Sequence, residues 1–227
     1  YIISVQLFIQ VRPMYPIMDI SKKNNSFVLE DAAEAWGMKC FVDSKWHMAG
    51  SIGDIGTYSF FPTKTLGAYG DAGLVVTNNE SLYEKIKSYR VHGATRKYHH
   101  DYIGYNSRLD TIQAAILRVK LSYTKLSINA RNRHAEHYKK RLASVRQVRF
   151  QSINEDNQGV YYVFNILASE RDKLAEFLKV NGVATTIYYP KPLHLQKCFS
   201  YLGHKPGDFP VAEKVASEIL ALPIFPE

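Results

Sequence analysis

The chain has 227 residues, 46% of them hydrophobic, and a formal net charge of +8 at pH 7. This length is sufficient for one large core or two smaller ones, and the composition is neither that of a disordered chain nor that of a fibrous protein. The positive charge favours an anionic partner, for which nucleotide sugars, a cofactor phosphate and nucleic acid all qualify. No apolar run approaches the length of a membrane span and the opening residues lack a basic leader, so we expect neither an anchor nor a signal peptide.

The residue types that bind metals or form disulfides are sparse. Cys40 and Cys198 form no CxxC motif and no metal-ligand spacing, so reduced thiols in a cytoplasmic protein are expected. His99 and His100 are adjacent, but they lack the further ligands that zinc requires. We therefore expect no metal site.

The first elements form a βαβ unit that ends in carboxylates. A strand-like run opens the chain, a short helix is expected over residues 14–23 after Pro13, and a buried strand follows over residues 27–31. Asp31 ends that strand, where a carboxylate in a dry site has to be paired or take part in chemistry. Ala32 and Ala33 are small enough to let a flat ring lie against the backbone.

The next strand ends close to a single lysine. Residues 57–61 are β-branched and aromatic, as in a buried strand, and Pro62 ends the strand because proline cannot donate to the ladder. Lys64 then lies at the strand's carboxyl end, the edge at which open α/β sheets bind ligands. Such a lysine is either a solvated surface charge or a partly desolvated amine that condenses with a carbonyl.

Lys64 and Asp31 together also leave two interpretations. They could form a plain ion pair. They also meet the needs of pyridoxal phosphate, which requires an amine for its aldehyde and an anion that keeps its ring nitrogen protonated. These two residues alone do not decide between the two.

The middle of the chain predicts a strand, two helices and a domain link. A strand is expected over residues 74–77 beside the Lys64 strand, and a helix over residues 80–91 with Asn78 or Asn79 as its cap. Ser107 and Asp110 have the spacing of a capping box for a further helix. Its expected packing seam consists of Leu109, Ile112, Ile116, Val119, Tyr123 and Leu126. The opposite face is basic, and it is interpreted as solvated or, alternatively, as a nucleic-acid contact that includes Arg131, Arg133 and Lys140.

The remainder predicts a small α/β domain. A strand is expected over residues 160–166, a helix from a Ser169 cap to residue 181, and a strand over residues 183–189. The pattern of the long helix weakens after Leu126, so residues 1–125 and 126–227 are predicted to form separate domains. Residues 188–194 are too rich in proline for regular structure.

Three motifs make the family recognisable. The segments VLEDAAEAWG, GSIGDIGTYSFFPTKTLGAYGDAGLVVT and KYHHDYIGYNSRLDTIQAAILRVKL resemble the DegT/StrS family of sugar-nucleotide aminotransferases. The resemblance runs from about Val5 to the last residue. It implies an α/β fold, namely part of the large domain of an aspartate-aminotransferase-like enzyme (PLP fold type I) followed by a small α/β C-terminal domain.

The resemblance also implies an activity and its residues. The activity is transfer of an amino group, from a donor such as glutamate, to the keto group of a nucleotide-linked deoxysugar with pyridoxal 5'-phosphate as cofactor. Lys64 would bond to the cofactor and move the proton, while Asp31 would keep the ring nitrogen charged. The other cofactor contacts implied are Ala33, Glu34 at the ring hydroxyl, Ser59 at the phosphate, and Asn106, which would reach across a homodimer to the neighbour's phosphate.

Other implications concern the substrate and the extent of the chain. His194 matches a family histidine near the sugar, and Tyr188 stands where relatives usually have histidine. Relatives carry a segment before the position of Tyr1 that holds the cofactor phosphate, so the chain is expected to be a fragment. A truncated, catalytically impaired remnant that still dimerises, or a nucleic-acid binder, are the alternatives to an active aminotransferase.

Overall fold

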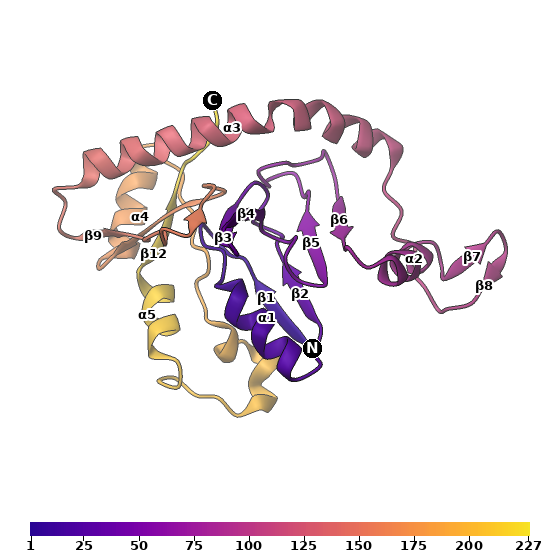
Figure 1. The fold of residues 1–227 in the computed structure, drawn as a ribbon. Coiled ribbons are helices and arrows are strands. Elements are labelled where there is room, and N and C mark those ends of the chain that lie inside the picture. Colours follow the sequence, from indigo (N-terminus) through magenta and orange to yellow (C-terminus); the bar gives the residue numbers. More distant parts are fainter. The chain divides into compact units, whose positions relative to one another are not determined.

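The computed structural model describes all 227 residues and divides them into two compact units. The N-terminal unit comprises Tyr1–Asn129 and Ile153–Tyr162, and the C-terminal unit comprises Ala130–Ser152 and Val163–Glu227. The long helix α3 (Thr111–Leu142) begins in the first unit and ends in the second (Figure 1). The return of Ile153–Tyr162 to the first unit is a feature that the strand pattern did not indicate.

The main sheet of the N-terminal unit has the strand order β1-β2-β5-β6. The first three strands are parallel and the fourth is antiparallel to its neighbour. Their bounds are β1 (Ile2–Val5), β2 (Val28–Asp31), β5 (Ile55–Ser59) and β6 (Gly73–Val76). Helix α1 (Met14–Lys23) connects β1 to β2, which confirms the predicted βαβ unit.

Local signals account for the two short helices of this unit. Helix α1 begins directly after Pro13, as the sequence predicts. Helix α2 (Glu80–Tyr89) is capped by Asn79, whose side chain accepts a hydrogen bond from the Leu82 N–H at 3.1 Å. Both predicted helices are confirmed.

Two small sheets of the N-terminal unit were not predicted. The antiparallel sheet β10-β3-β4 consists of β3 (Lys39–Val42), β4 (Lys45–Met48) and β10 (Asn157–Gln158). Asp43 and Ser44 form the tight turn between β3 and β4, each with positive φ. Strands β7 (Ala94–Arg96) and β8 (His99–His100) form a separate two-stranded ribbon.

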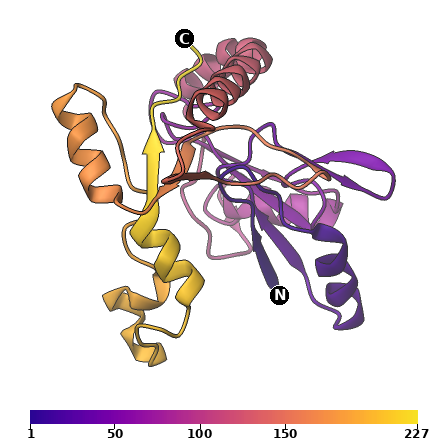
Figure 2. The same cartoon turned by 90° about the vertical axis from the view of Figure 1, so that its left-hand side faces the viewer.

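The C-terminal unit has an antiparallel sheet of order β12-β11-β9. Its strands are β9 (Val148–Phe150), β11 (Phe164–Ala168) and β12 (Ile219–Leu222). Its helices are α4 (Arg171–Val180), α5 (Pro210–Glu218) and the short 3₁₀ turns η1 (Leu193–Leu195) and η2 (Lys197–Leu202). Helix α5 leads directly into β12 (Figure 2).

Several predicted boundaries in this part of the chain are wrong. The strand expected over residues 160–166 lies at Phe164–Ala168, because residues 160–162 belong to the N-terminal unit. The segment 183–189 forms no strand and makes only an isolated bridge between Thr186 and Ala221. The N-cap of α4 is Glu170 rather than Ser169. Similarly, α3 begins at Thr111, so Ser107 does not cap it.

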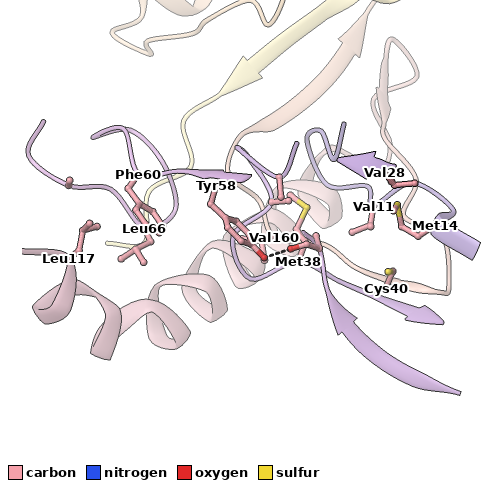
Figure 3. Packing of buried hydrophobic residues seen from close by; sticks show 14 residues of the cluster. Val11, Met14, Val28, Met38, Cys40, Tyr58, Phe60, Leu66, Leu117 and Val160 are labelled. Carbon is pink, nitrogen blue, oxygen red and sulfur yellow. Dashed lines mark hydrogen bonds between the residues drawn. The ribbon is translucent and has the colours of Figure 1, made fainter. Parts of the chain in front are cut away.

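The core of the N-terminal unit lies between the main sheet, the segment before α1, and α3. Figure 3 shows Phe60, Leu66 and Leu117 at one end of the cluster and Val11, Met14 and Val28 at the other. Tyr58 lies between them and donates from its hydroxyl to the Ala49 carbonyl at 2.5 Å. A buried tyrosine therefore keeps a hydrogen-bond partner inside the apolar cluster.

Helix α3 buries a different face from the one that the sequence indicated. Of the expected seam, Ile112, Val119, Tyr123 and Leu126 are 60–74% exposed. The buried residues are instead Leu117, Thr124, Ala130, Arg131 and Ala135. Arg131 donates to the carbonyl of Ile224 at 2.5 Å, so it does not belong to a solvated basic face. Although α3 has 32 residues, neither it nor any other helix is both long and apolar enough to cross a membrane.

The two cysteines are expected to react at very different rates. Cys40 is 4% exposed, and burial together with the Glu30 carboxylate raises the pKa of its thiol to about 11, whereas Cys198 is exposed. Because the thiolate is the reactive form, a thiol reagent at pH 8 should modify Cys198 rapidly and Cys40 only when the chain unfolds. Titration of thiols with and without urea measures this. The Cys198→Ser variant should lose the rapid phase, and rapid reaction of both native thiols would contradict the expectation.

The same pKa shift gives a pH dependence of stability. The folded pKa of Cys40 lies above the ordinary value of 9.0, so folding favours the protonated thiol. Its contribution to stability is complete below about pH 9 and is lost as the pH rises toward 11. The free energy of unfolding should consequently fall less steeply over this range in Cys40→Ala than in the parent chain.

Candidate functional site

The candidate site lies at the carboxyl ends of β2 and β5. These two strands are parallel neighbours, with Asp31 opposite Thr57, so their carboxyl ends meet at one edge of the sheet. Buried residues alternate along both strands: Val28 and Glu30 on β2 face the core. The alternation and the register place Asp31 and Ser59 on the opposite face of the sheet from Glu30. The structure thus brings Asp31 and Ser59 to one face and one edge.

Lys64 is not a solvated lysine. Its side chain is 14% exposed, and its Nζ lies 3.4 Å from Glu34 Oε1. The carboxylate belongs to the segment that follows β2, so the pair joins the two strand ends. Lys64 therefore forms an ion pair with Glu34, and not the pair with Asp31 that the sequence left open.

The loop that carries Lys64 is tightly folded. The Lys64 N–H donates to the Phe61 carbonyl at 2.9 Å, and the Ala68 N–H donates to the Phe60 carbonyl at 2.8 Å. A Cβ at Gly67 would lie 2.4 Å from the Pro62 oxygen, so no larger residue fits there without a shift of the backbone. The lysine is consequently presented by a defined loop rather than by a loose surface segment.

Two polar side chains at the strand ends, Asp31 and Ser59, retain hydrogen-bonding capacity. Asp31 Oδ1 accepts from the Ala33 N–H at 3.1 Å. Ser59 Oγ accepts from the Phe61 N–H at 3.2 Å, which leaves its own hydroxyl hydrogen to donate. A carboxylate has about four acceptor positions, so Asp31 can still accept from a ligand.

The remaining predicted residues belong to other segments of the chain. Asn106 is exposed and makes an isolated bridge with Val91 in the N-terminal unit. Tyr188 and His194 both belong to the C-terminal unit. There, His194 Nε2 lies 2.9 Å from Glu213 Oε1. The Gly207 N–H chiefly, and His194 in addition, lower the pKa of the Glu213 carboxyl. The predicted roles of Asn106, Tyr188 and His194 stay predictions.

The sequence analysis missed Tyr162 and Glu30. Tyr162 lies with its ring centroid 4.5 Å from Lys64 Nζ, although 98 positions separate the two residues. No local pattern indicates a contact over that separation. Glu30 is fully buried, and the alternation of β2 was a usable signal, because Glu30 falls on the same face as Val28.

The residues of the site fit pyridoxal phosphate in their chemistry. A partly buried primary amine, Lys64, can bond to an aldehyde, and the carboxylate of Asp31 can pair with a protonated ring nitrogen. Ser59 offers a hydroxyl donor on the same face as Asp31. The amine, the anion and the hydroxyl that this cofactor requires are therefore all present along these two strand ends.

The comparison with solved structures first defines the class of the protein, because the chain has the fold of aminotransferases. The structure matches an aminotransferase from Brucella abortus described as DegT DnrJ EryC1 StrS, with a TM-score of 0.90 and 36% identity over 99% of this chain and 59% of that chain. It also matches NtdA from Bacillus subtilis, solved with bound cofactor PMP, with a TM-score of 0.83 and 30% identity over 99% of this chain and 52% of that chain. The predicted fold, part of a type I large domain with a small α/β domain, is confirmed.

The sequence comparisons then identify the family. The chain belongs to the DegT/DnrJ/EryC1/StrS aminotransferase family, whose profile matches residues 1–227. It is 47% identical to a "pleiotropic regulatory protein" of Geobacillus stearothermophilus, over 100% of this chain and 60% of the relative. It is 39% identical to a UDP-N-acetyl-3-dehydro-alpha-D-glucosamine 3-aminotransferase of Acidithiobacillus ferrooxidans, over 100% and 59%. The chain thus spans about 60% of the length of these relatives.

Proposed function

We propose that the protein transfers an amino group, from a donor such as glutamate, to the keto group of a nucleotide-linked sugar, with pyridoxal 5'-phosphate as cofactor. Membership of the family and the sugar-nucleotide substrate in the name of the Acidithiobacillus relative support this proposal. Because the chain spans about 60% of its relatives, the proposal concerns the activity of a protein that extends as they do.

The observation that carries the proposal is the partly buried Lys64 at the ligand-binding edge of the sheet. Pyridoxal phosphate, when bound, supplies an aldehyde that bonds to amines and a ring that accepts electrons. We assign Lys64 Nζ to bond to that aldehyde and, when released, to carry the proton that leaves the donor's carbon. Asp31 would pair with the protonated ring nitrogen, and Ser59 would donate a hydrogen bond to the phosphate.

Ala33 and Glu34, which follow β2, are the remaining proposed cofactor contacts at these strand ends. Ala33 leaves room for a flat ring along the backbone after β2. Glu34 is assigned to the ring hydroxyl, and its 3.4 Å contact with Lys64 gives the amine an anionic neighbour in the cofactor-free chain. A carboxylate beside the ring hydroxyl is unfavourable when both are charged, so one of the two groups has to hold a proton.

We propose that the protein works as a homodimer, in which Asn106 would reach the cofactor phosphate held by the neighbouring copy. Ile112, Val119, Tyr123 and Leu126 of α3 are largely exposed and recur at helical spacing, which supports a second copy, since exposed apolar surface of this kind generally marks a contact. Tyr188 and His194 are assigned to the sugar substrate. Both assignments rest on the match to the family pattern.

A covalent labelling experiment tests the role of Lys64. Purified chain is mixed with pyridoxal phosphate, reduced with borohydride and digested, and the modified lysine is identified by mass spectrometry. We expect one predominant site of labelling, Lys64, and at least a tenfold loss of labelling in Lys64→Ala. The reason is that a partly buried amine beside polar side chains retains the cofactor longer than a surface amine does.

Lys45→Ala is the matched control, because Lys45 is an exposed lysine on β4. Its labelling at Lys64 should equal that of the parent chain. Labelling spread evenly over the surface lysines of a folded chain would overturn the assignment and would support the catalytically impaired alternative.

A further inference from the structure

Tyr162 is held against the loop that carries Lys64. Its ring centroid lies 4.5 Å from Lys64 Nζ, and its hydroxyl lies 3.3 Å from Thr63 Oγ1. Both contacts lie within the N-terminal unit, to which Ile153–Tyr162 returns. One aromatic side chain therefore touches the lysine and the residue just before it.

The segment that carries Tyr162 is firmly attached to this unit. Val160 and Tyr161, which precede it, are 1% and 5% exposed. Strand β10 pairs with β3, and the Asn157 side chain accepts from the Val11 N–H at 3.2 Å. The ring is consequently placed by buried neighbours and backbone pairing, and not only by its contact with Lys64.

Both neighbours of Lys64 Nζ attract a positive charge. The face of an aromatic ring attracts a cation within about 6 Å, and the Glu34 carboxylate attracts it through charge. The ring and the carboxylate together form a holding position for the charged, uncombined lysine.

We propose that Tyr162 is a positioning residue for the amine of Lys64. The inference rests on the proposed function, in which Lys64 is bonded to the cofactor at one stage and released at another. A released lysine has a long, flexible stem, and it must stay at the sheet edge to carry the proton. The Tyr162 ring, with Glu34, holds the released ammonium there, while the buried residues that precede Tyr162 keep the ring in its place.

The experiment measures the reactivity of Lys64 in the cofactor-free chain. Reductive methylation with formaldehyde and cyanoborohydride is followed at Lys64 by mass spectrometry for the parent chain, Tyr162→Leu and Tyr162→Phe. Leucine removes the π face, so methylation of Lys64 should accelerate at least threefold, because the amine then loses one of the two groups that hold it and becomes freer to meet the reagent. Phenylalanine keeps the face, so its rate should stay within twofold of the parent rate.

The chain offers a matched control on an exposed helix. Lys87 Nζ lies 5.3 Å from the Tyr83 ring centroid and 3.2 Å from Glu84 Oε1, but about half of its side chain is exposed. Tyr83→Leu should leave the methylation of Lys87 unchanged within experimental error, because solvent screens these contacts. The melting temperature of each variant separates reactivity from loss of structure. If Tyr162→Leu does not fold, Tyr162→Met serves the same purpose.

The outcomes separate this inference from the proposed function. Parent-like reactivity of Lys64 in Tyr162→Leu would overturn the positioning role, while borohydride labelling of Lys64 could still support the aminotransferase. Equal acceleration in Tyr162→Phe and Tyr162→Leu would also overturn it, since the hydroxyl and not the ring would then be responsible. A faster Lys64 in Tyr162→Leu, restored in Tyr162→Phe, supports it.

Discussion

Replacing Glu30 with glutamine should lower the free energy of unfolding by about 3 kcal/mol or more. The side chain is fully buried, and four N–H donors converge on it. Oε1 accepts from the backbone of Ile52 and Gly53 at 2.6 and 2.7 Å, and Oε2 accepts from Gly50 at 2.9 Å and from the Gln6 side chain at 3.1 Å. Glutamine replaces one of the two acceptor oxygens with an NH₂ group. In either orientation of the amide, that NH₂ group faces two of the four N–H groups and cannot accept from them.

Urea unfolding measures the effect, with Glu84→Gln as the control. Glu84 is an exposed carboxylate that pairs only with Lys87 on the surface of α2, so its replacement should change stability by less than about 0.5 kcal/mol. A midpoint for Glu30→Gln equal to that of the parent would show that the buried charge contributes nothing to the fold.

The position of Glu30 explains why a buried carboxylate stands beside the candidate site. It precedes Asp31 on β2 and faces the core, while its oxygens bind the backbone of residues 50–53, which lead into β5. The carboxylate thus ties the strand of Asp31 to the segment that begins the strand before Lys64. We infer that the Glu30 carboxylate fixes how the carboxyl ends of β2 and β5 are aligned along the sheet.

The sequence predicted those elements whose signals are local. Helix α1 after Pro13, helix α2 under Asn79 and the strands around Asp31 and Lys64 each depend on a few neighbouring residues, and the structure confirms them. The capping boxes at Ser107 and Ser169 failed even though the spacing was right. A capping pattern states only that a helix can start at a residue, and other local contacts decide whether it does.

The failures concern contacts between distant parts of the chain. Apolar periodicity on α3 predicted a packing seam that is wrong, because Ile112 and Leu126 are largely exposed while Ala135 is fully buried. Likewise, the return of residues 153–162 to the N-terminal unit brings Tyr162 to Lys64, and no pattern within a single window indicates it. The sequence thus indicated the two strand ends, and it missed the contact of Tyr162 with Lys64, which depends on tertiary packing.

Gly56→Ala should destabilise the N-terminal unit by about 3 kcal/mol or more. It should thereby disturb the candidate site through the strand that leads to Lys64. A Cβ at Gly56 would lie 1.7 Å from the Gly50 oxygen and 2.6 Å from its carbonyl carbon. These are backbone atoms of a segment that Glu30 also holds through the Gly50 N–H. The chain cannot move away from the new methyl group without breaking bonds to the buried carboxylate.

Gly70→Ala is the matched control for this variant. There, the nearest atom to an added Cβ is the end of the Gln113 side chain at 3.0 Å, which can rotate away, so the change should cost less than about 1 kcal/mol. Urea unfolding and labelling of Lys64 are measured on both variants. Because Gly56 lies opposite Glu30 in the β2–β5 pairing, a less stable Gly56→Ala chain should also label more slowly at Lys64. If Gly56→Ala lowers the free energy of unfolding but leaves the labelling of Lys64 unchanged, the loop of Lys64 keeps its shape independently of the β2–β5 pairing.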